Sequence, residues 1–244
     1  MGCALPGTRH LFEGFYKVRF ELGGTVGRSV MYAGDGRMLG GNSAFAHIGR
    51  YDKDGDEVAV EIQTVRHNPD PNYRAMAGTD DATLIARGRP DGHLYRFKGE
   101  LKELPGVPFA SVMTPITEDE IPIAGGVGEG GVTNGLYSIH IRLLDGVDGG
   151  LTGVMLLNRG RILGGDAFFY YLGTYTSDNG RWKGQILNQE HTPALGENPI
   201  FGGHEVGIGF AGSYDADGAV LDATALAGKR SLRLTAVLKL IRRA

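Results

Sequence analysis

Cysteine is nearly absent from this sequence: one Cys occurs in 244 residues, so no intrachain disulfide can form. Only ten prolines are present and no Gly-X-Y period occurs, which excludes a collagen-like chain. No apolar run reaches the ~18 residues of a membrane-spanning helix. No charged and then apolar leader opens the sequence, so we expect a cytoplasmic protein without a membrane span.

An excess of charge is also lacking, because 25 Lys and Arg face 28 Asp and Glu, for a net charge of −3. This balance argues against a strongly basic surface and therefore against direct nucleic-acid binding. Apolar residues make up 41 %, enough to form a packed core. Glycine, in contrast, is abundant: 41 residues, more than twice the usual share of about 7 %.

The sequence contains an internal repeat. The segment 36–42 (GRMLGGN) returns 124 residues later as 160–166 (GRILGGD), and the blocks 36–51 and 160–175 share 8 of 16 residues without a gap. Repeats of this kind indicate a duplicated structural unit. We expect two homologous domains, 11–116 and 133–242, joined by an acidic, Gly-rich linker at 117–132. The linker length permits either a tight pair or two loosely tethered domains.

Both halves carry the pattern of antiparallel β-structure. The segment 57–66 alternates charged and apolar residues, which predicts a half-buried strand with Val58, Val60 and Ile62 on one face. A second strand is predicted at 231–240, and Gly and Asp turns recur every 8–12 residues. Seven or eight strands per half can close into an up-and-down barrel, whose interior is filled or contains one small ligand.

Motifs for cofactor, metal or nucleophilic chemistry are weak. The segment 126–131 spells GxGxxG, but an acidic segment containing Pro precedes it and a strand follows, so we interpret it as linker. The acidic turn 52–57 lacks the spacing of a calcium loop. His67 and His191 repeat at equivalent positions, and each is expected to satisfy a hydrogen bond at a strand end. We predict a protein that is not an enzyme, with no cofactor and no metal site.

The densest aromatic cluster, 168–171, alternates sides in a strand, so two rings are expected to face inward and two outward. The inward pair would form core or pocket lining, and the outward pair could anchor an interface. Together with the methionines of the strands, this cluster supplies the candidate ligand-binding residues: Phe168, Phe169, Tyr170, Tyr171, Met155 and Met31.

The second half resembles a known family. Its segments 135–139 (GLYSI), 159–166 (RGRILGGD) and 171–173 (YLG) are similar to the opening of the GrlR-type negative regulators of type III secretion. The first half repeats the pattern more loosely at 14–18, 36–42 and 47–49. The motif covers roughly the first 40 residues of each half.

The resemblance implies a lipocalin-like barrel in a regulator that binds and silences a transcriptional activator. It further implies dimers, so the two halves would pair within the chain as a pseudo-dimer. The family's partner contact is an acidic turn, which corresponds here to Asp52, Asp54, Asp56 and Glu57. The equivalent turn 176–181 has lost the acidic run, so at most one half keeps the feature.

We therefore predict an all-β protein of two tandem lipocalin-like up-and-down antiparallel barrels. The first functional hypothesis is a regulator that acts by protein–protein contact through the acidic turn. The sequence of that turn is also compatible with a solvated hairpin that has no partner. The second is a carrier or sensor of a small apolar ligand inside one or both barrels. The two are compatible, because a ligand could control partner binding.

Overall fold

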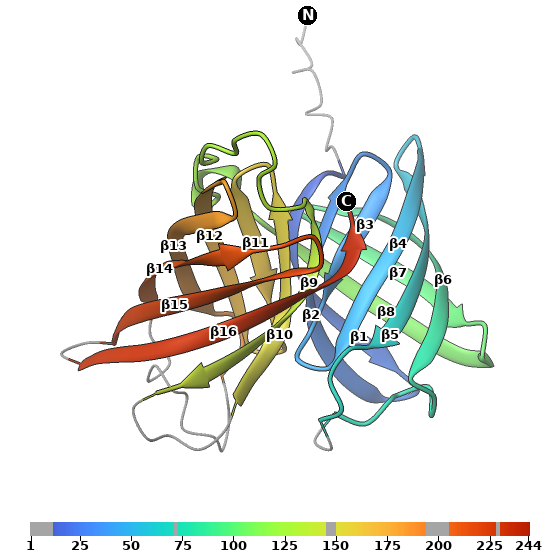
Figure 1. Ribbon diagram of the computed structural model, residues 1–244. Coiled ribbons are helices and arrows are strands. Elements are labelled where there is room, and N and C mark those ends of the chain that lie inside the picture. The colour runs from blue at the N-terminus through green and yellow to red at the C-terminus, as the bar shows by residue number, and fades with distance from the viewer. Residues whose placement is uncertain (1–11, 71–72, 145–149, 194–204, 228–229) are drawn as a thin grey trace, which may run out of the picture.

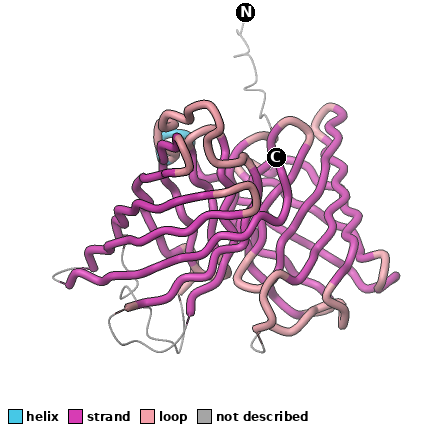
Figure 2. The backbone as a smooth tube through the Cα atoms, in the orientation of Figure 1, coloured by secondary structure: helices cyan, strands magenta, loops and turns pink. Residues whose placement is uncertain are grey.

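The computed structural model describes residues 12–70, 73–144, 150–193, 205–227 and 230–244. Strands dominate, and the helical element among these residues is a short 3-10 turn, η1 (Glu118–Glu120) (Figure 2). No helix in the described part of the chain is long and apolar enough to cross a membrane. The strands are β1 (Gly14–Leu22), β2 (Thr25–Gly34), β3 (Arg37–Gly41), β4 (Phe45–Asp54), β5 (Glu57–Arg66), β6 (Asp81–Asp91), β7 (Leu94–Leu101), β8 (Leu104–Ile116), β9 (Gly135–Leu143), β10 (Gly150–Asn158), β11 (Arg161–Gly165), β12 (Phe169–Asp178), β13 (Arg181–Glu190), β14 (Val206–Tyr214), β15 (Gly218–Ala227) and β16 (Arg230–Arg243).

The strands form two closed antiparallel barrels that lie side by side (Figure 1). In the first barrel each of β1 to β8 pairs with the next, and β8 returns to pair with β1. The second barrel has the same order from β9 to β16, and β16 closes it against β9. The prediction of two tandem up-and-down barrels is confirmed. Closure leaves neither sheet with an open edge along its strands.

Local sequence accounts for these elements. The strand predicted at 57–66 is β5, and its inward residues Val58, Val60 and Ile62 are all buried. Asp35 and Gly36 both have positive φ, 51° and 74°, as a tight turn between paired strands requires. The repeated GG-Asn and GG-Asp motifs also have a structural role. The carboxamide of Asn42 accepts hydrogen bonds from the backbone N–H groups of residues 44 and 45, which fixes the turn into β4.

Three apolar clusters form the core. One lines the interior of the first barrel, another forms the interior of the second, and the third lies between the barrels, where it joins residues from both halves. The third cluster has pseudo-two-fold symmetry: Val154 meets Gly41, while its equivalent Val30 meets Gly165. A Cβ atom at Gly41 would come within 2.9 Å of the Val154 side chain, and one at Gly165 within 2.8 Å of Val30. Glycine at both places therefore permits close approach of the two sheets.

Polar contacts add to this interface. The Thr152 hydroxyl donates to the backbone carbonyl of Ser43 at 2.7 Å, and the Asn68 amide donates to the Thr152 hydroxyl at 3.0 Å. The Lys17 ammonium lies 5.5 Å from the centre of the Tyr170 ring, which belongs to the other barrel. The two halves thus form a tight pair rather than loosely tethered domains.

The segment 117–132 packs along the second barrel. Gly125 donates its N–H to the carbonyl of Gly160 at 3.0 Å, and Gly128 donates to that of Ser177 at 2.9 Å. Val132 enters the core of the second barrel. The GxGxxG sequence is therefore a connecting segment that follows the barrel wall, with no helix after it.

Candidate ligand-binding cavity

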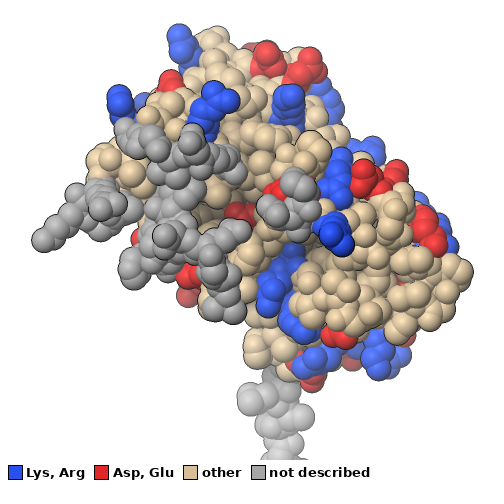
Figure 3. Space-filling view, turned by 90° about the horizontal axis from the view of Figure 1, so that it is seen from below, with Lys and Arg blue, Asp and Glu red and all other residues tan. Residues whose placement is uncertain are grey.

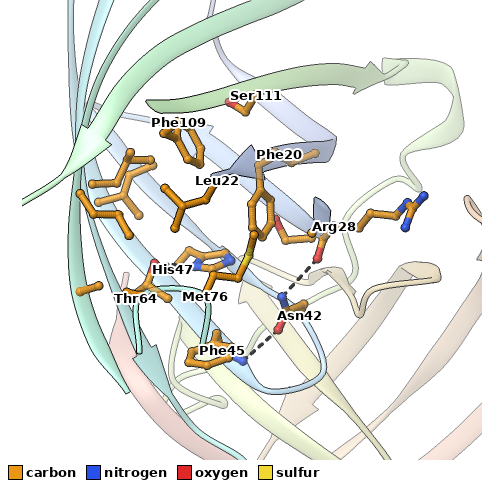
Figure 4. A pocket seen from close by; sticks show the side chains of 18 of the residues that line it. Phe20, Leu22, Arg28, Asn42, Phe45, His47, Thr64, Met76, Phe109 and Ser111 are labelled. Carbon is orange, nitrogen blue, oxygen red and sulfur yellow. Dashed lines mark hydrogen bonds between the residues drawn. The ribbon is translucent and has the colours of Figure 1, made fainter. Parts of the chain in front are cut away.

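The interior of the first barrel contains a cavity of about 600 Å³ (Figure 4). This volume falls within the range of about 300–1,000 Å³ that is typical of small-molecule sites. Its wall is mainly apolar, with a few polar side chains on the inner faces of several strands. The apolar lining includes Val18, Phe20, Leu22, Met31, Met38, Val60, Ile62, Leu84, Ala86, Phe97, Phe109 and Met113.

Side-chain size explains why this space exists in the first barrel. Val60 and Ala86 face each other across β5 and β6 and line the cavity. The residues 124 positions later, Gly184 and Phe210, form the equivalent pair in β13 and β14. There the Phe210 ring packs over Gly184 and lies 4.6 Å from the Trp182 ring, centre to centre. An aromatic cluster thus occupies the place in the second barrel that Val60 and Ala86 line in the first.

One end of the cavity is closed by aromatic rings. Phe12, just before β1, is fully buried and contacts Tyr16, Tyr51, Tyr95 and Phe97. Ring centres lie 4.8 to 5.7 Å apart, within the usual range for aromatic pairs. These rings form a plug between the cavity and solvent at this end of the barrel.

The other end is covered by a loop and by the second barrel. Residues 73–77 and 79 of the β5–β6 loop line the cavity, and Met76 and Ala77 pack on the barrel core. Ala167 and Phe168, in the β11–β12 connection of the second barrel, complete the wall. The site is therefore composite: the second barrel contributes to the mouth of a cavity that lies in the first.

His47 is the most unusual polar residue of the wall. The residue is 8 % exposed, and its Nδ1 lies 3.0 Å from the Thr64 hydroxyl. Burial, together with the positive charge that His67 can carry, lowers the pKa of His47 from 6.5 to about 4. His47 is therefore neutral at physiological pH. It can donate or accept one hydrogen bond at its free nitrogen, depending on its tautomer.

Cationic side chains lie at the mouth. Arg28 and Arg74 both line the cavity, and the Arg28 side chain extends away from the barrel interior (Figure 4). Burial is the main cause that lowers the pKa of His191 to about 4, and the positive charges of Lys17 and Arg28 lower it further. Both cations therefore lie near the second barrel. Figure 3 shows Lys and Arg side chains gathered along the crevice between the barrels.

The repeated histidines have structural contacts. His67 Nε2 lies 3.0 Å from the backbone carbonyl of Asn42, and His191 Nε2 lies 3.4 Å from that of Asp166. Both rings thus brace the turn that precedes the fourth strand of their barrel. Within the described ranges, no three His, Cys, Asp or Glu side chains are grouped to hold a metal ion.

The six residues predicted for ligand binding separate into three environments. Met31 and Phe168 line the cavity of the first barrel. Tyr171 and Met155 are buried in the core of the second barrel, where Phe169 packs against them, and Tyr170 belongs to the inter-barrel cluster. The alternation in β12 is as expected. The sequence analysis did not identify His47 and Ala86 as candidate residues. The signal that could have found them is that the repeat places larger residues, Tyr171 and Phe210, at the equivalent positions.

The acidic turn predicted for partner binding is the hairpin between β4 and β5. Asp52, Asp54 and Asp56 are exposed, whereas Glu57 forms ion pairs with Arg87 and Arg89. The hydrogen bonds from these arginines lower the pKa of the Glu57 carboxyl. The surface therefore presents three exposed aspartates beside the ion pairs that Glu57 makes with two arginines.

Comparison of the sequence with protein-family models and with curated proteins gave no match. Among solved structures, one match is a crystal structure from Bacteroides fragilis named "putative outer membrane protein", with 10 % sequence identity. The match covers 93 % of this chain and 96 % of that chain, with a TM-score of 0.25. At that score we draw nothing about function from the likeness.

Proposed function

We propose that this protein is a carrier or sensor that binds a small, largely apolar molecule inside its first barrel. The observation that supports the proposal is the cavity of about 600 Å³, closed by aromatic rings at one end and covered at the other. Burial of an apolar ligand in such a space contributes about 25 cal/mol per Å² of apolar surface removed from water, before the entropy cost of association. The second barrel supports the mouth of the site.

The test is a titration with N-phenyl-1-naphthylamine, a neutral apolar dye that fluoresces in dry sites. The wild-type chain is expected to bind one dye per chain. The double variant Val60→Gly/Ala86→Phe copies the filled arrangement of the second barrel and is expected to lose binding. Ile85→Phe is the matched control, because Ile85 is the neighbouring residue on the outer face of β6 and is 40 % exposed.

Equal dye binding in the wild type, the double variant and the Ile85→Phe control would place the dye outside the cavity and contradict the proposal. Circular dichroism and thermal melting show whether the double variant stays folded. If it does not, Ala86→Leu alone provides a smaller filling of the same space.

Regulation by protein contact is the second candidate, and the exposed aspartates of the β4–β5 hairpin are the observation that favours it. Electrostatic contacts of this kind act on association rate and on salt dependence. If it is correct, Asp52, Asp54 and Asp56 changed together to Asn would abolish binding to a transcriptional activator of type III secretion genes without loss of the fold. Unchanged binding of that activator would contradict it.

A further inference from the structure

The cavity wall contains a buried polar atom without a partner. Among the described residues, four buried side-chain polar atoms have no hydrogen-bond partner, and they belong to His47, His67, Tyr175 and Gln189. Of these four residues, only His47 lines the cavity. A buried donor or acceptor left unpaired costs free energy, so such an atom calls for an explanation.

The surroundings of His47 leave its Nε2 atom to a molecule from outside the chain. Its Nδ1 is paired with Thr64, and the Phe20 ring stands perpendicular to the imidazole with ring centres 6.2 Å apart. Figure 4 shows the His47 ring beside Met76 of the covering loop. Apolar neighbours of this kind cannot satisfy a ring nitrogen.

The repeat provides an internal comparison. Tyr171 occupies the equivalent position in the second barrel, where its hydroxyl donates to the Asp166 carboxylate at 2.6 Å. Asp166 in turn accepts backbone hydrogen bonds from residues 168 and 169. The second barrel thus pairs the polar group at this position internally, whereas the first leaves the Nε2 atom of His47 without a partner.

The rest of the wall indicates the shape of the bound molecule. Four of the six methionines of the chain line the cavity: Met31, Met38, Met76 and Met113. Methionine side chains are flexible and polarisable, so they adapt to apolar bodies of varied shape. Most of the ligand surface would therefore be aliphatic, with one polar group close to the mouth.

Resting on the proposed function, we propose that the ligand is an apolar molecule with a hydroxyl group near one end, such as a long-chain alcohol, whose hydroxyl hydrogen-bonds His47 Nε2. A hydroxyl both donates and accepts, so it matches either tautomer of a neutral imidazole. Its apolar body extends between Met31, Met38 and Met113, away from the mouth. His47 then acts as a specificity-determining residue.

The test is displacement of N-phenyl-1-naphthylamine by 1-decanol, decane and decanoate from the full chain. The variants are His47→Leu, which removes the hydrogen bond, His47→Gln, which keeps a donor and an acceptor, and His93→Leu as the control. His93 is an exposed histidine in the β6–β7 turn and is not among the residues that line the cavity. Each affinity is expressed relative to that of decane for the same variant.

We expect wild type and His93→Leu to bind decanol about ten-fold more tightly, relative to decane, than His47→Leu does, since one buried hydrogen bond is worth about that factor. His47→Gln is expected to recover part of the preference, and decane is expected to bind all four proteins alike. An unchanged decanol preference in His47→Leu would overturn the inference. So would stronger displacement by decanoate that is insensitive to His47, because it would assign the polar contact to Arg28 or Arg74.

Failure of the proposed function has a different signature. In that case neither the dye nor decane binds wild type. Binding of both with no dependence on the hydroxyl refutes only the present inference.

Discussion

Acid should destabilise the first barrel through His47. Burial holds its pKa at about 4 in the folded chain, against 6.5 for an ordinary histidine. Between these values the unfolded chain binds a proton that the folded chain does not. The stabilising effect of the neutral ring is therefore fully present above pH 6.5 and is lost as the pH falls toward 4.

The magnitude follows from the two pKa values. One unit of pKa corresponds to about 1.4 kcal/mol, so His47 alone should remove about 2 kcal/mol of stability by pH 5 and about 3 kcal/mol by pH 4. These losses are a large fraction of the free energy of unfolding of a typical domain, which is about 5–15 kcal/mol. His191, whose pKa is also lowered to about 4, adds to the total acid sensitivity.

The assay is urea unfolding at pH 7.5 and pH 5.0 for wild type and His47→Gln. The quantity of interest is the loss of unfolding free energy between the two pH values, which should be about 2 kcal/mol smaller in the variant. Trp182, the single tryptophan, reports on the second barrel by fluorescence, while circular dichroism reports on both. Comparing the two signals shows whether the barrels unfold together.

The same pH-dependent loss in His47→Gln and wild type would refute the reasoning. It would mean that the ring takes up its proton in the folded state at its ordinary pKa, and so reaches water. The His93→Leu variant serves as the control, since it removes an exposed histidine and leaves the cavity wall intact.

Three further changes test the packing. Leu156→Ala, in the cluster between the barrels, should cost about 2–5 kcal/mol in urea unfolding, and a much smaller loss would argue against a tight pair. Phe12→Ala should cost about 3–5 kcal/mol in urea unfolding and speed the entry of the fluorescent dye; an unchanged rate of entry would show that the ring is no plug. Tyr171→Phe should lower the free energy of unfolding by about 1–3 kcal/mol, because it removes the hydroxyl that donates to the buried Asp166 carboxylate. Unchanged stability would mean that water replaces the hydroxyl.

Much of the architecture follows from local patterns in the sequence. The repeat at 124 residues, the alternation at 57–66 and the Gly-Asp turns together predict two equivalent antiparallel barrels. These signals are readable because strand periodicity and turn chemistry involve residues close in sequence. The boundaries of β5 agree with its alternation to the residue.

The cavity could not be predicted in the same way. Whether a barrel is filled depends on pairs such as Val60 with Ala86, which face each other from different strands once the register is set. Nor does sequence distance indicate that Phe168 of one half lies at the mouth of the other. Of the aromatic cluster 168–171, Phe168 lines the cavity, whereas the other three rings pack in the second barrel or between the barrels.

Because both barrels belong to one chain, the wall that Phe168 contributes to the cavity is always present. Tethering keeps the two halves at a high effective concentration at any dilution, which a pair of separate subunits cannot do. A symmetric dimer of identical barrels would also carry two equivalent mouths. In this chain the side chains at equivalent inner positions differ in size between the two halves, so it would instead bind a single ligand molecule. The apparent affinity for that ligand should be independent of protein concentration.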